Sequence, residues 1–355
     1  MSILGTDTVA TTAVDRAAAQ YRRHTRPLWR RLLLRTETAI IAAIVLLIII
    51  ATTTVPYFAQ PYTYLTLLLN SAPILLMLLP VTLIIITGDI DLSVGSVLGF
   101  SSAIFGLMFE AGVPIPLAAL LAVVGGGLVG VLNGVLVTIV GLPSLAVTIG
   151  TLALFRGIAV GLLGTRAITK FPSDVTSFVG SPLFPGAPVP IITAAIIVLA
   201  IVFAILLHFT PFGRGVFAIG LSPETAAFSG VRVNRTRLIL FVLSGLVASA
   251  TGVYYTLQYS NAIGTNGNGF ELQVVTAIVL GGVSIWGGRG TLLGAIAGGV
   301  LIATLNKTLQ LAGVGSDTIS VVTGAALIFS VVVASVAGFI SRRRRAKASV
   351  IAAGA

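Results

Sequence analysis

The sequence predicts an all-α polytopic membrane protein with about ten membrane segments, some of them broken or re-entrant, and with both termini in the cytoplasm. Of its 355 residues, 56% are hydrophobic and only 9% are charged, whereas about a quarter of the residues of a soluble domain are charged. Two stretches, Thr38–Gly88 and Ala111–Phe155, contain no charged residue. Each is about twice the ~20 residues that one helix needs to cross the hydrocarbon, so each holds two spans. The 40 glycines indicate close helix packing and interrupted helices.

The distribution of basic residues predicts the orientation. The net charge is +11, and most Lys and Arg residues gather before Glu37, within Thr210–Arg237 and after Ile340. The positive-inside rule places all three groups in the cytoplasm, and Arg166 and Lys170 are then the only bases in the outer loops. Basic clusters beside apolar spans indicate a lipid bilayer as the partner, and no nucleic acid is expected.

The chain divides into three parts. Residues 1–37 form a basic cytoplasmic tail, in which 21–35 mixes arginines with apolar residues and is expected to lie at the inner membrane surface. Residues 38–340 form the transmembrane domain, and 341–355 form a second basic cytoplasmic tail. The basic leader is too long for an ordinary cleaved signal peptide, so the first span is expected to be retained.

Apolar runs and the Pro, Gly and charged residues between them delimit the membrane segments. They are expected at 38–55, 65–87, 92–109, 116–139, 143–163, 189–209, 238–258, 272–287, 291–311 and 318–340. Six crossings place 210–237 inside and ten place the C-terminal tail inside, which agrees with the charge distribution. The longest outer connection, 164–188, is rich in proline and is expected to be a structured external segment on which another protein docks.

The central polar loop, 210–237, contains a short helix whose ends are predicted by residue type. Ser222 suits the N-cap, and Pro223 suits the first helical position because the N–H that it lacks would be unpaired there. Glu224 complements the positive helix end, and Gly230 supplies the left-handed conformation that ends the helix. A helix this short needs something to dock against.

Two interpretations of this helix are open: it rests on the membrane surface, or it couples the chain to a cytoplasmic partner. The coupling interpretation assigns the contact to Ser222, Glu224, Ala226, Ala227, Phe228, Ser229 and Gly230.

Two acidic residues, Asp89 and Asp91, lie in the glycine-rich stretch 88–99, GDIDLSVGSVLG. A charge at membrane depth is costly. One interpretation is that Asp91 caps a helix starting at Leu92, with its charge on the positive helix end. The other, compatible with the first, is that the carboxylates line a polar pathway.

A second glycine-rich stretch, 279–299, interrupts the apolar pattern near its end. Its glycines indicate either tight helix packing or non-helical backbone that lines a water-filled path. Asn133 and Asn306 lie within apolar spans and are expected to hydrogen-bond between helices. The candidates for a translocation pathway or a structural motif are therefore Asp89, Asp91, Ser93, Asn133, Gly281, Gly282, Ser284, Gly287, Gly288 and Asn306.

Several kinds of chemistry have no residues to support them. The chain contains no cysteine and only two, widely separated histidines, so neither a disulfide nor a common metal site is expected. It has no phosphate-binding GxxxxGK[ST] loop, no HExxH motif and no plausible Ser–His pair. No cofactor is expected in this chain. If ATP drives transport, ATP and Mg are bound by another chain.

Three stretches, GDIDLSVGSV, AIGLSPETAAFSGVRV and LGGVSIWGGRGTLLGAIAGG, resemble the motifs of bacterial ABC-importer permeases of the ribose/simple-sugar class. Related branches of this family take up xylose, rhamnose and the autoinducer-2 signal. The resemblance runs in register from about residue 38 to 340. It implies a non-catalytic permease subunit of the bacterial inner membrane that moves a sugar or sugar-like solute by alternating access. It also implies a second permease chain, identical or paralogous, two cytoplasmic ATPase subunits and an extracytoplasmic solute-binding protein.

The resemblance assigns the family's coupling segment to Ala218–Gly230 and its first motif to Gly88–Gly95. This sequence departs from the family at Asp89, where a second glycine is more common, and at Leu221–Pro223, where an asparagine commonly follows the preceding glycine. The second departure bears on where the coupling helix starts. The matching residues are Glu224, Ala226, Ala227, Ser229 and Gly230 in the coupling segment, and Gly88, Asp89, Asp91, Leu92, Ser93 and Gly95 in the first motif.

Two other classes of function compete with an importer permease. A self-sufficient secondary transporter would couple to protons through Asp89, Asp91 or Glu271, but it has no reason to keep a helix shaped for docking. A membrane enzyme would need a catalytic constellation that the sequence lacks.

Overall fold

The computed structural model describes residues 36–332, and this part of the chain is helical throughout its regular structure. Within it, β-type pairing is limited to two isolated bridges, Ile168–Ala262 and Pro182–Pro190. The predicted basic tails and the end of the last membrane segment lie outside the described residues. The predicted all-α fold is confirmed for the described part.

The helices follow the predicted segments closely. In chain order they are α3 (Thr36–Thr54), α4 (Pro61–Ile86), α5 (Val94–Glu110), α6 (Ile115–Thr138), α7 (Ser144–Leu163), α8 (Ser173–Gly180), α9 (Ile192–Phe209), α10 (Pro211–Leu221), α11 (Pro223–Phe228), α12 (Val233–Tyr259), α13 (Phe270–Leu280), α14 (Leu292–Leu311) and a helix at Ser316–Val332. Six of them, α4, α6, α7, α9, α12 and α14, are long and apolar enough to cross a membrane, and four of the described helices are apolar but shorter. The chain is a polytopic membrane protein.

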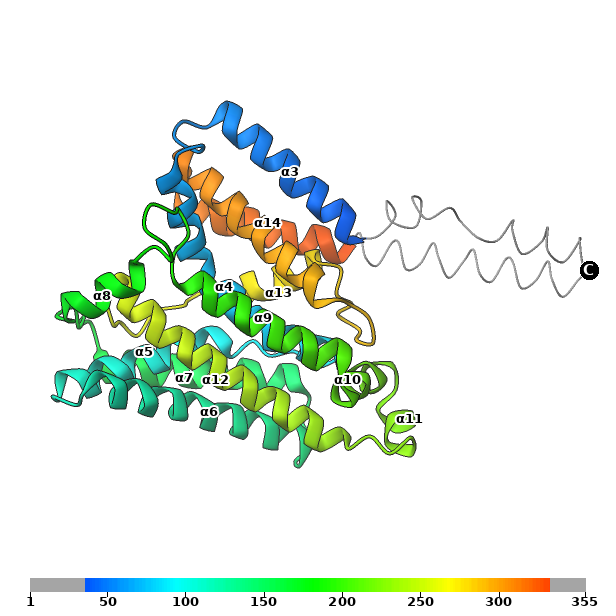
Figure 1. Ribbon diagram of the computed structural model, residues 1–355. Coiled ribbons are helices and arrows are strands. Elements are labelled where there is room, and N and C mark those ends of the chain that lie inside the picture. Colours follow the sequence, from blue (N-terminus) through cyan, green and yellow to red (C-terminus); the bar gives the residue numbers. More distant parts are fainter. Residues whose placement is uncertain (1–35, 333–355) are drawn as a thin grey trace, which may run out of the picture.

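Helix α4 lies at the centre of the bundle, where it contacts α9, α12, α13 and α14 (Figure 1). Every residue from Ser71 to Ile86 is buried. A helix that is apolar all round is stable only when it is covered on all sides. Its two internal prolines, Pro73 and Pro80, lack the N–H that would bind the carbonyl four residues earlier. The Leu69 carbonyl freed by Pro73 accepts instead from the Tyr254 hydroxyl at 3.1 Å, so the interruption is compensated inside the protein.

Helices α6 and α12 pack with their backbones in close approach. A Cβ added to Gly130 would meet the Phe241 carbonyl oxygen, and one added to Gly245 would meet the Gly126 carbonyl oxygen. Small residues at such a crossing increase the van der Waals contact that holds membrane helices together. The outer faces of α6, α7 and α9 are apolar and exposed, as expected of surfaces that face lipid or another membrane chain.

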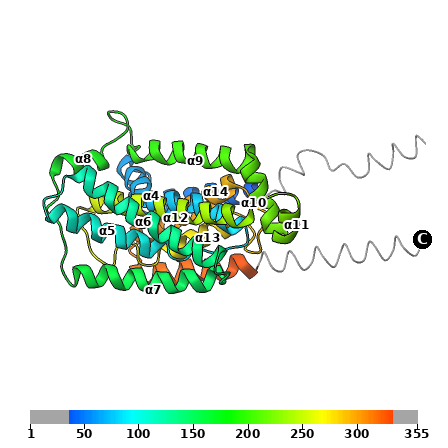
Figure 2. The same ribbon diagram turned by 90° about the horizontal axis from the view of Figure 1, so that it is seen from below.

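The two predicted docking regions lie at opposite ends of the bundle. Figures 1 and 2 show α8 at one end, with α10 and α11 at the other. Helix α8 lies within 164–188, the predicted outer connection, and α10 and α11 lie within the central loop 210–237. The start of α3 is at the same end as α10 and α11 in Figure 1.

Some of the predicted boundaries are wrong. The predicted segment 272–287 ends early, because Gly282, at φ 82°, turns the chain after α13 and its N–H binds the Val279 carbonyl. The central loop contains more helix than predicted. Thr210 caps α10 by accepting a hydrogen bond from the Gly213 N–H, and α12 already begins at Val233.

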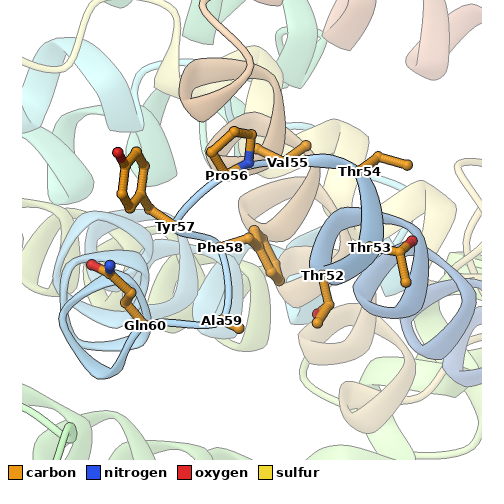
Figure 3. Close-up of a pocket in the computed structure, with 9 residues that line it drawn as sticks. All are labelled: Thr52, Thr53, Thr54, Val55, Pro56, Tyr57, Phe58, Ala59 and Gln60. Carbon is orange, nitrogen blue, oxygen red and sulfur yellow. The ribbon is translucent and has the colours of Figure 1, made fainter.

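The turn between α3 and α4 contains a pocket. This pocket, of about 400 Å³, is lined by residues 52–60, and Figure 3 shows their side chains around the turn. Phe58 is buried, whereas Tyr57 is exposed, and the lining contains no charged side chain. This pocket contains none of the residues that the sequence singles out.

Candidate functional site

The short helix α11 has the ends that the sequence predicts. The Ser222 hydroxyl accepts a hydrogen bond from the Thr225 N–H at 3.2 Å, which makes Ser222 the N-cap. Gly230 has φ 85°, its N–H binds the Ala227 carbonyl at 3.0 Å, and the chain turns away. The predicted cap, first-turn proline and glycine stop are confirmed.

The faces of α11 correct one part of the coupling prediction. Ala226 is 2% exposed and packs against its own chain, so its side chain is not available to a partner. Ala227 is exposed, and Phe228 is 95% exposed. The exposed surface of the helix therefore includes one small residue beside one large aromatic residue. The Phe228 side chain is therefore accessible to a binding partner.

Glu224 strengthens the N-terminal turn of α11. The Ser222 hydroxyl donates to its Oε2 at 3.1 Å. The backbone N–H of Glu224 itself and then this hydroxyl lower the pKa of the carboxyl below its usual value. The side chain therefore stays negative at neutral pH, where it complements the positive end of the helix.

Backbones from three separate stretches meet at Gly88, Gly220, Gly287 and Gly288, which we call the glycine junction. The Gly288 N–H donates to the Ile86 carbonyl at 2.8 Å. A Cβ added to Gly220 would collide with both of these groups, and one added to Gly287 would lie 2.9 Å from the Gly88 nitrogen. The junction thus joins the end of α4, the end of α10 and the loop after α13, and α11 follows directly in the chain.

Asp91 is the centre of a buried hydrogen-bond network. Its Oδ1 accepts from the N–H and the hydroxyl of Ser93, at 3.0 and 2.6 Å, and its Oδ2 accepts from the Ser244 hydroxyl at 2.7 Å. Asn133 donates to the Ser93 hydroxyl at 2.9 Å, as an inter-helix hydrogen bond, which confirms the prediction for this residue. The network joins the α4–α5 connection to α6 and α12.

The predicted helix start at Leu92 is wrong by two residues. Helix α5 begins at Val94, and Asp91 binds the residue just before it. The reason is tertiary: the second carboxylate oxygen is bound by Ser244 of α12, which holds residues 91–93 in a turn.

Asp89 forms an ion pair that sequence reasoning did not identify. Its Oδ2 lies 2.8 Å from Nε of Arg237, and the Thr87 hydroxyl donates to the same oxygen at 3.1 Å. The pair lies in the wall of a pocket of about 500 Å³ that also includes Ser144 and Asn234. From the sequence, Arg237 contributes only to the predicted orientation. The feature that could have identified its role is its position in the second turn of a long apolar helix.

The remaining candidates lie in other places. Asn306 accepts from Thr323 at 3.3 Å and donates to Gln273 at 3.1 Å, so it joins three helices, but it is not part of the Asp91 network. The Ser284 N–H binds the Arg289 carbonyl within the loop after α13, and Gly281 packs against α14. The ten candidates therefore form three groups: the Asp91 network with its neighbour Asp89, the glycine junction with its loop, and the α13–α14 contact.

Sequence reasoning also missed Arg156, on α7. Its guanidinium donates to the carbonyls of Gly264, Asn266 and Gly95, at 3.1, 2.6 and 3.0 Å. The sequence feature that could have identified it is a single arginine within an apolar segment. Within residues 36–332, no cluster of three or more His, Cys, Asp or Glu side chains is placed to hold a metal ion.

Comparison with known proteins places these features in a family. The profile of the family described as branched-chain amino acid transport system / permease component matches residues 63–336. The chain is 39% identical, over 264 residues, to the autoinducer 2 import system permease protein LsrD of Escherichia coli (strain K12), and equally to that of Shigella flexneri. Each match covers 73% of this chain and 79% of the relative. No solved structure matches this chain.

Proposed function

Because this chain belongs to the family of branched-chain amino acid transport system permease components, we propose that it is the permease subunit of an ATP-binding-cassette importer for a sugar or sugar-like solute. Separate cytoplasmic subunits bind Mg and hydrolyse ATP, since this sequence has no phosphate-binding loop. The chain pairs with a second permease chain in the bacterial inner membrane, and an external binding protein delivers the solute. The ten helices on the predicted segments are its membrane segments, with both termini in the cytoplasm.

The observation that supports this proposal best is the exposed surface of α11. Ala227 and Phe228 are exposed on a helix that is capped at both ends, and the glycine junction begins two residues before its N-cap. A short helix of this kind is stable when it docks in a groove. We assign that groove to the ATPase subunit, with Phe228 as the aromatic anchor.

The glycine junction gives the proposal a mechanism. At Gly220 and Gly288 the backbones touch without intervening side chains, so α10 cannot shift without moving the end of α4 and the loop after α13. The end of α4 leads directly to Asp89 and to the Asp91 network. Movement of α11 during the ATPase cycle would therefore displace the connection between α4 and α5. This displacement would open the pathway to one side of the membrane and then to the other.

The solute class follows from the relatives. Their names describe import of autoinducer 2, and the resemblance includes permeases for monosaccharides. We propose a small polyhydroxylated molecule of this kind as the solute.

The competing proposal, a proton-coupled transporter, finds less support at the acidic residues. Asp89 is paired with Arg237, and Asp91 accepts three hydrogen bonds. Uptake that survives ATP depletion and is abolished by a protonophore would favour this alternative over the importer.

The test is co-purification of the ATPase with the permease, combined with uptake by intact cells. Phe228→Ala should reduce both, because it removes the anchor. Phe184→Ala is the matched control: this phenylalanine is 65% exposed but lies in the outer connection. It should leave ATPase co-purification unchanged. Normal co-purification of Phe228→Ala with normal uptake would mean that α11 merely rests on the membrane surface.

A further inference from the structure

A polar stretch of chain, Ser260–Gly269 (SNAIGTNGNG), enters the bundle between α12 and α13; we call it the re-entrant segment. It runs along α5. A Cβ added to Gly106 would meet the Ala262 side chain, and one added to Gly95 would lie 2.8 Å from the Gly267 carbonyl oxygen. Eleven residues of helix separate these two glycines, a rise of about 16 Å. This is about half the thickness of the hydrocarbon, which is roughly 30 Å.

Arg156 supplies hydrogen bonds to this segment at its deep end. Non-helical backbone at membrane depth needs partners for its polar groups. Arg156 provides them for the carbonyls of Gly264 and Asn266, and a third hydrogen bond to the Gly95 carbonyl fixes the guanidinium on α5. One side chain of α7 therefore fastens the segment to α5.

A second set of contacts aligns the segment with its neighbours. The Asn266 amide donates to the Ser102 hydroxyl at 2.9 Å, and Ser102 is bonded to Thr256 at 2.6 Å. Glu271, in the first turn of α13, accepts from the Gly269 N–H, while its other carboxylate oxygen is buried against Gly95 without a hydrogen-bond partner. A buried carboxylate oxygen without a hydrogen-bond partner is energetically unfavourable. A movement of the segment that lets water reach this oxygen would therefore lower its free energy.

The re-entrant segment is also hydrogen-bonded to the predicted outer connection, 164–188. Ile168 and Ala262 exchange two backbone hydrogen bonds, at 3.1 and 2.9 Å. Ile168 lies in 164–188, the region proposed to receive the solute-binding protein. A shift of that region therefore pulls directly on the re-entrant segment.

The free face of the segment is polar. Thr265 and Asn268 are exposed in the isolated chain, although they lie among residues that pack beside the deep half of α5. Polar side chains at this depth face a protein interior or a water-filled cavity rather than lipid. This polar face therefore suits the wall of the proposed solute pathway.

We propose that the re-entrant segment is the outer gate of the solute pathway and that Arg156 is the positioning residue that holds it closed. This inference rests on the proposed permease function. Docking of the binding protein on 164–188 moves Ile168 and Ala262, the segment leaves Arg156, and the carbonyls of Gly264 and Asn266 become available to water and solute.

The first test uses the absence of cysteine from the chain. Asn268→Cys is labelled on intact cells with a membrane-impermeant thiol reagent, in the complete transporter. We expect Arg156→Gln to speed labelling by about tenfold or more, because the hydrogen bonds that close the gate are lost. Arg156→Lys, which keeps the charge and can donate, should restore slower labelling. Arg235→Gln, at an exposed arginine on the opposite end of the bundle, is the matched control and should leave the rate unchanged.

The second test closes the gate covalently and does not depend on Arg156. Cysteines at 106 and 262 would place their Cβ atoms close enough for a disulfide after a small shift. Oxidation should abolish the uptake that the double variant shows when reduced, and a reductant should restore it. In each single cysteine variant, the oxidant should leave uptake at the level of the same variant when reduced. Uptake that is unaffected by the complete cross-link would overturn the gate, as would unchanged Asn268→Cys labelling in a folded Arg156→Gln complex. If the unmodified transporter shows no ATP-driven uptake, the proposed function itself fails, which is a separate result.

Discussion

Single residues matter here through the partners that they find in other helices. Asp89 and Asp91 are two positions apart in one glycine-rich stretch, yet their surroundings differ. Asp91 is 2% exposed and accepts three hydrogen bonds. Asp89 is paired with Arg237, whose side chain is 21% exposed and can reach water if the pair is broken.

Asp91→Ala should therefore destabilise the protein more than Asp89→Ala. Removing Asp91 leaves Ser93 and Ser244 without their acceptor in a buried site, and we expect a loss of about 3 kcal/mol. Removing Asp89 should cost less, about 2 kcal/mol, because it leaves one buried nitrogen of Arg237 unpaired while the rest of that side chain, 21% exposed, can be hydrated. Thermal unfolding in detergent measures both. Equal stability of the two variants, or a larger loss for Asp89→Ala, would contradict the assignment of Asp91 as the centre of the network.

At the scale of elements, α11 shows how a single step along a helix, a rotation of about 100°, separates a buried residue from an exposed one. Ala226 and Ala227 are neighbours, but only Ala226 is buried. The pattern of small residues alone could not distinguish them.

Arginine at these two positions should have different effects. Ala226→Arg forces a long charged side chain into a packed site, so it should lower the thermal stability of the isolated permease. Ala227→Arg should leave that stability unchanged and should weaken ATPase co-purification by steric overlap. Glu224→Lys should weaken it more mildly, because it places a cation at the positive helix end. Wild-type co-purification of Ala227→Arg would remove α11 from the ATPase contact.

The glycine junction predicts a large effect from a single methyl group. Gly220→Ala places a Cβ against the Ile86 carbonyl and the Gly288 N–H, so these backbones must separate and their hydrogen bond is lost. We expect a stability loss of about 2 kcal/mol or more, with reduced uptake. Gly157→Ala is the matched control, because it lies in a helix with open space around it. If Gly220→Ala behaves like the control, the junction is not tightly packed.

At the scale of the whole molecule, the bundle has two functional ends. The end with α8 is proposed to receive the solute-binding protein, and the end with α11 is proposed to receive the ATPase. The Asp91 network, the glycine junction and the re-entrant segment lie along α5 and its connection to α4, so they link the two ends.

This arrangement predicts a specific labelling pattern. In intact cells, a cysteine replacing the exposed Asp174 should react with a membrane-impermeant reagent, whereas one replacing the exposed Arg235 should react only after the membrane is opened. Cysteines in the stretches Arg16–Arg35 and Arg342–Lys347 should behave like the one at 235. Labelling of position 174 from the inside alone would overturn the ten-segment orientation.

The sequence by itself determined the class of protein, the approximate positions of the membrane helices and the ends of α11. These properties follow from local composition: long apolar runs must be helical in lipid, and a Ser–Pro–Glu start with a glycine stop acts within one turn. The motifs also sufficed for the family. The apolar spans around Asn133 and Asn306 indicated hydrogen bonds between helices for these two residues.

Only the tertiary structure decided which of these residues act together. Arg237 reaches Asp89 across more than a hundred residues of chain, and Arg156 reaches the re-entrant segment across a similar distance. The glycine junction likewise brings three separate motifs to one point. No periodicity in the sequence encodes such pairings, because they depend on the depth and rotation of each helix. Those are set by the packing of the whole bundle around α4.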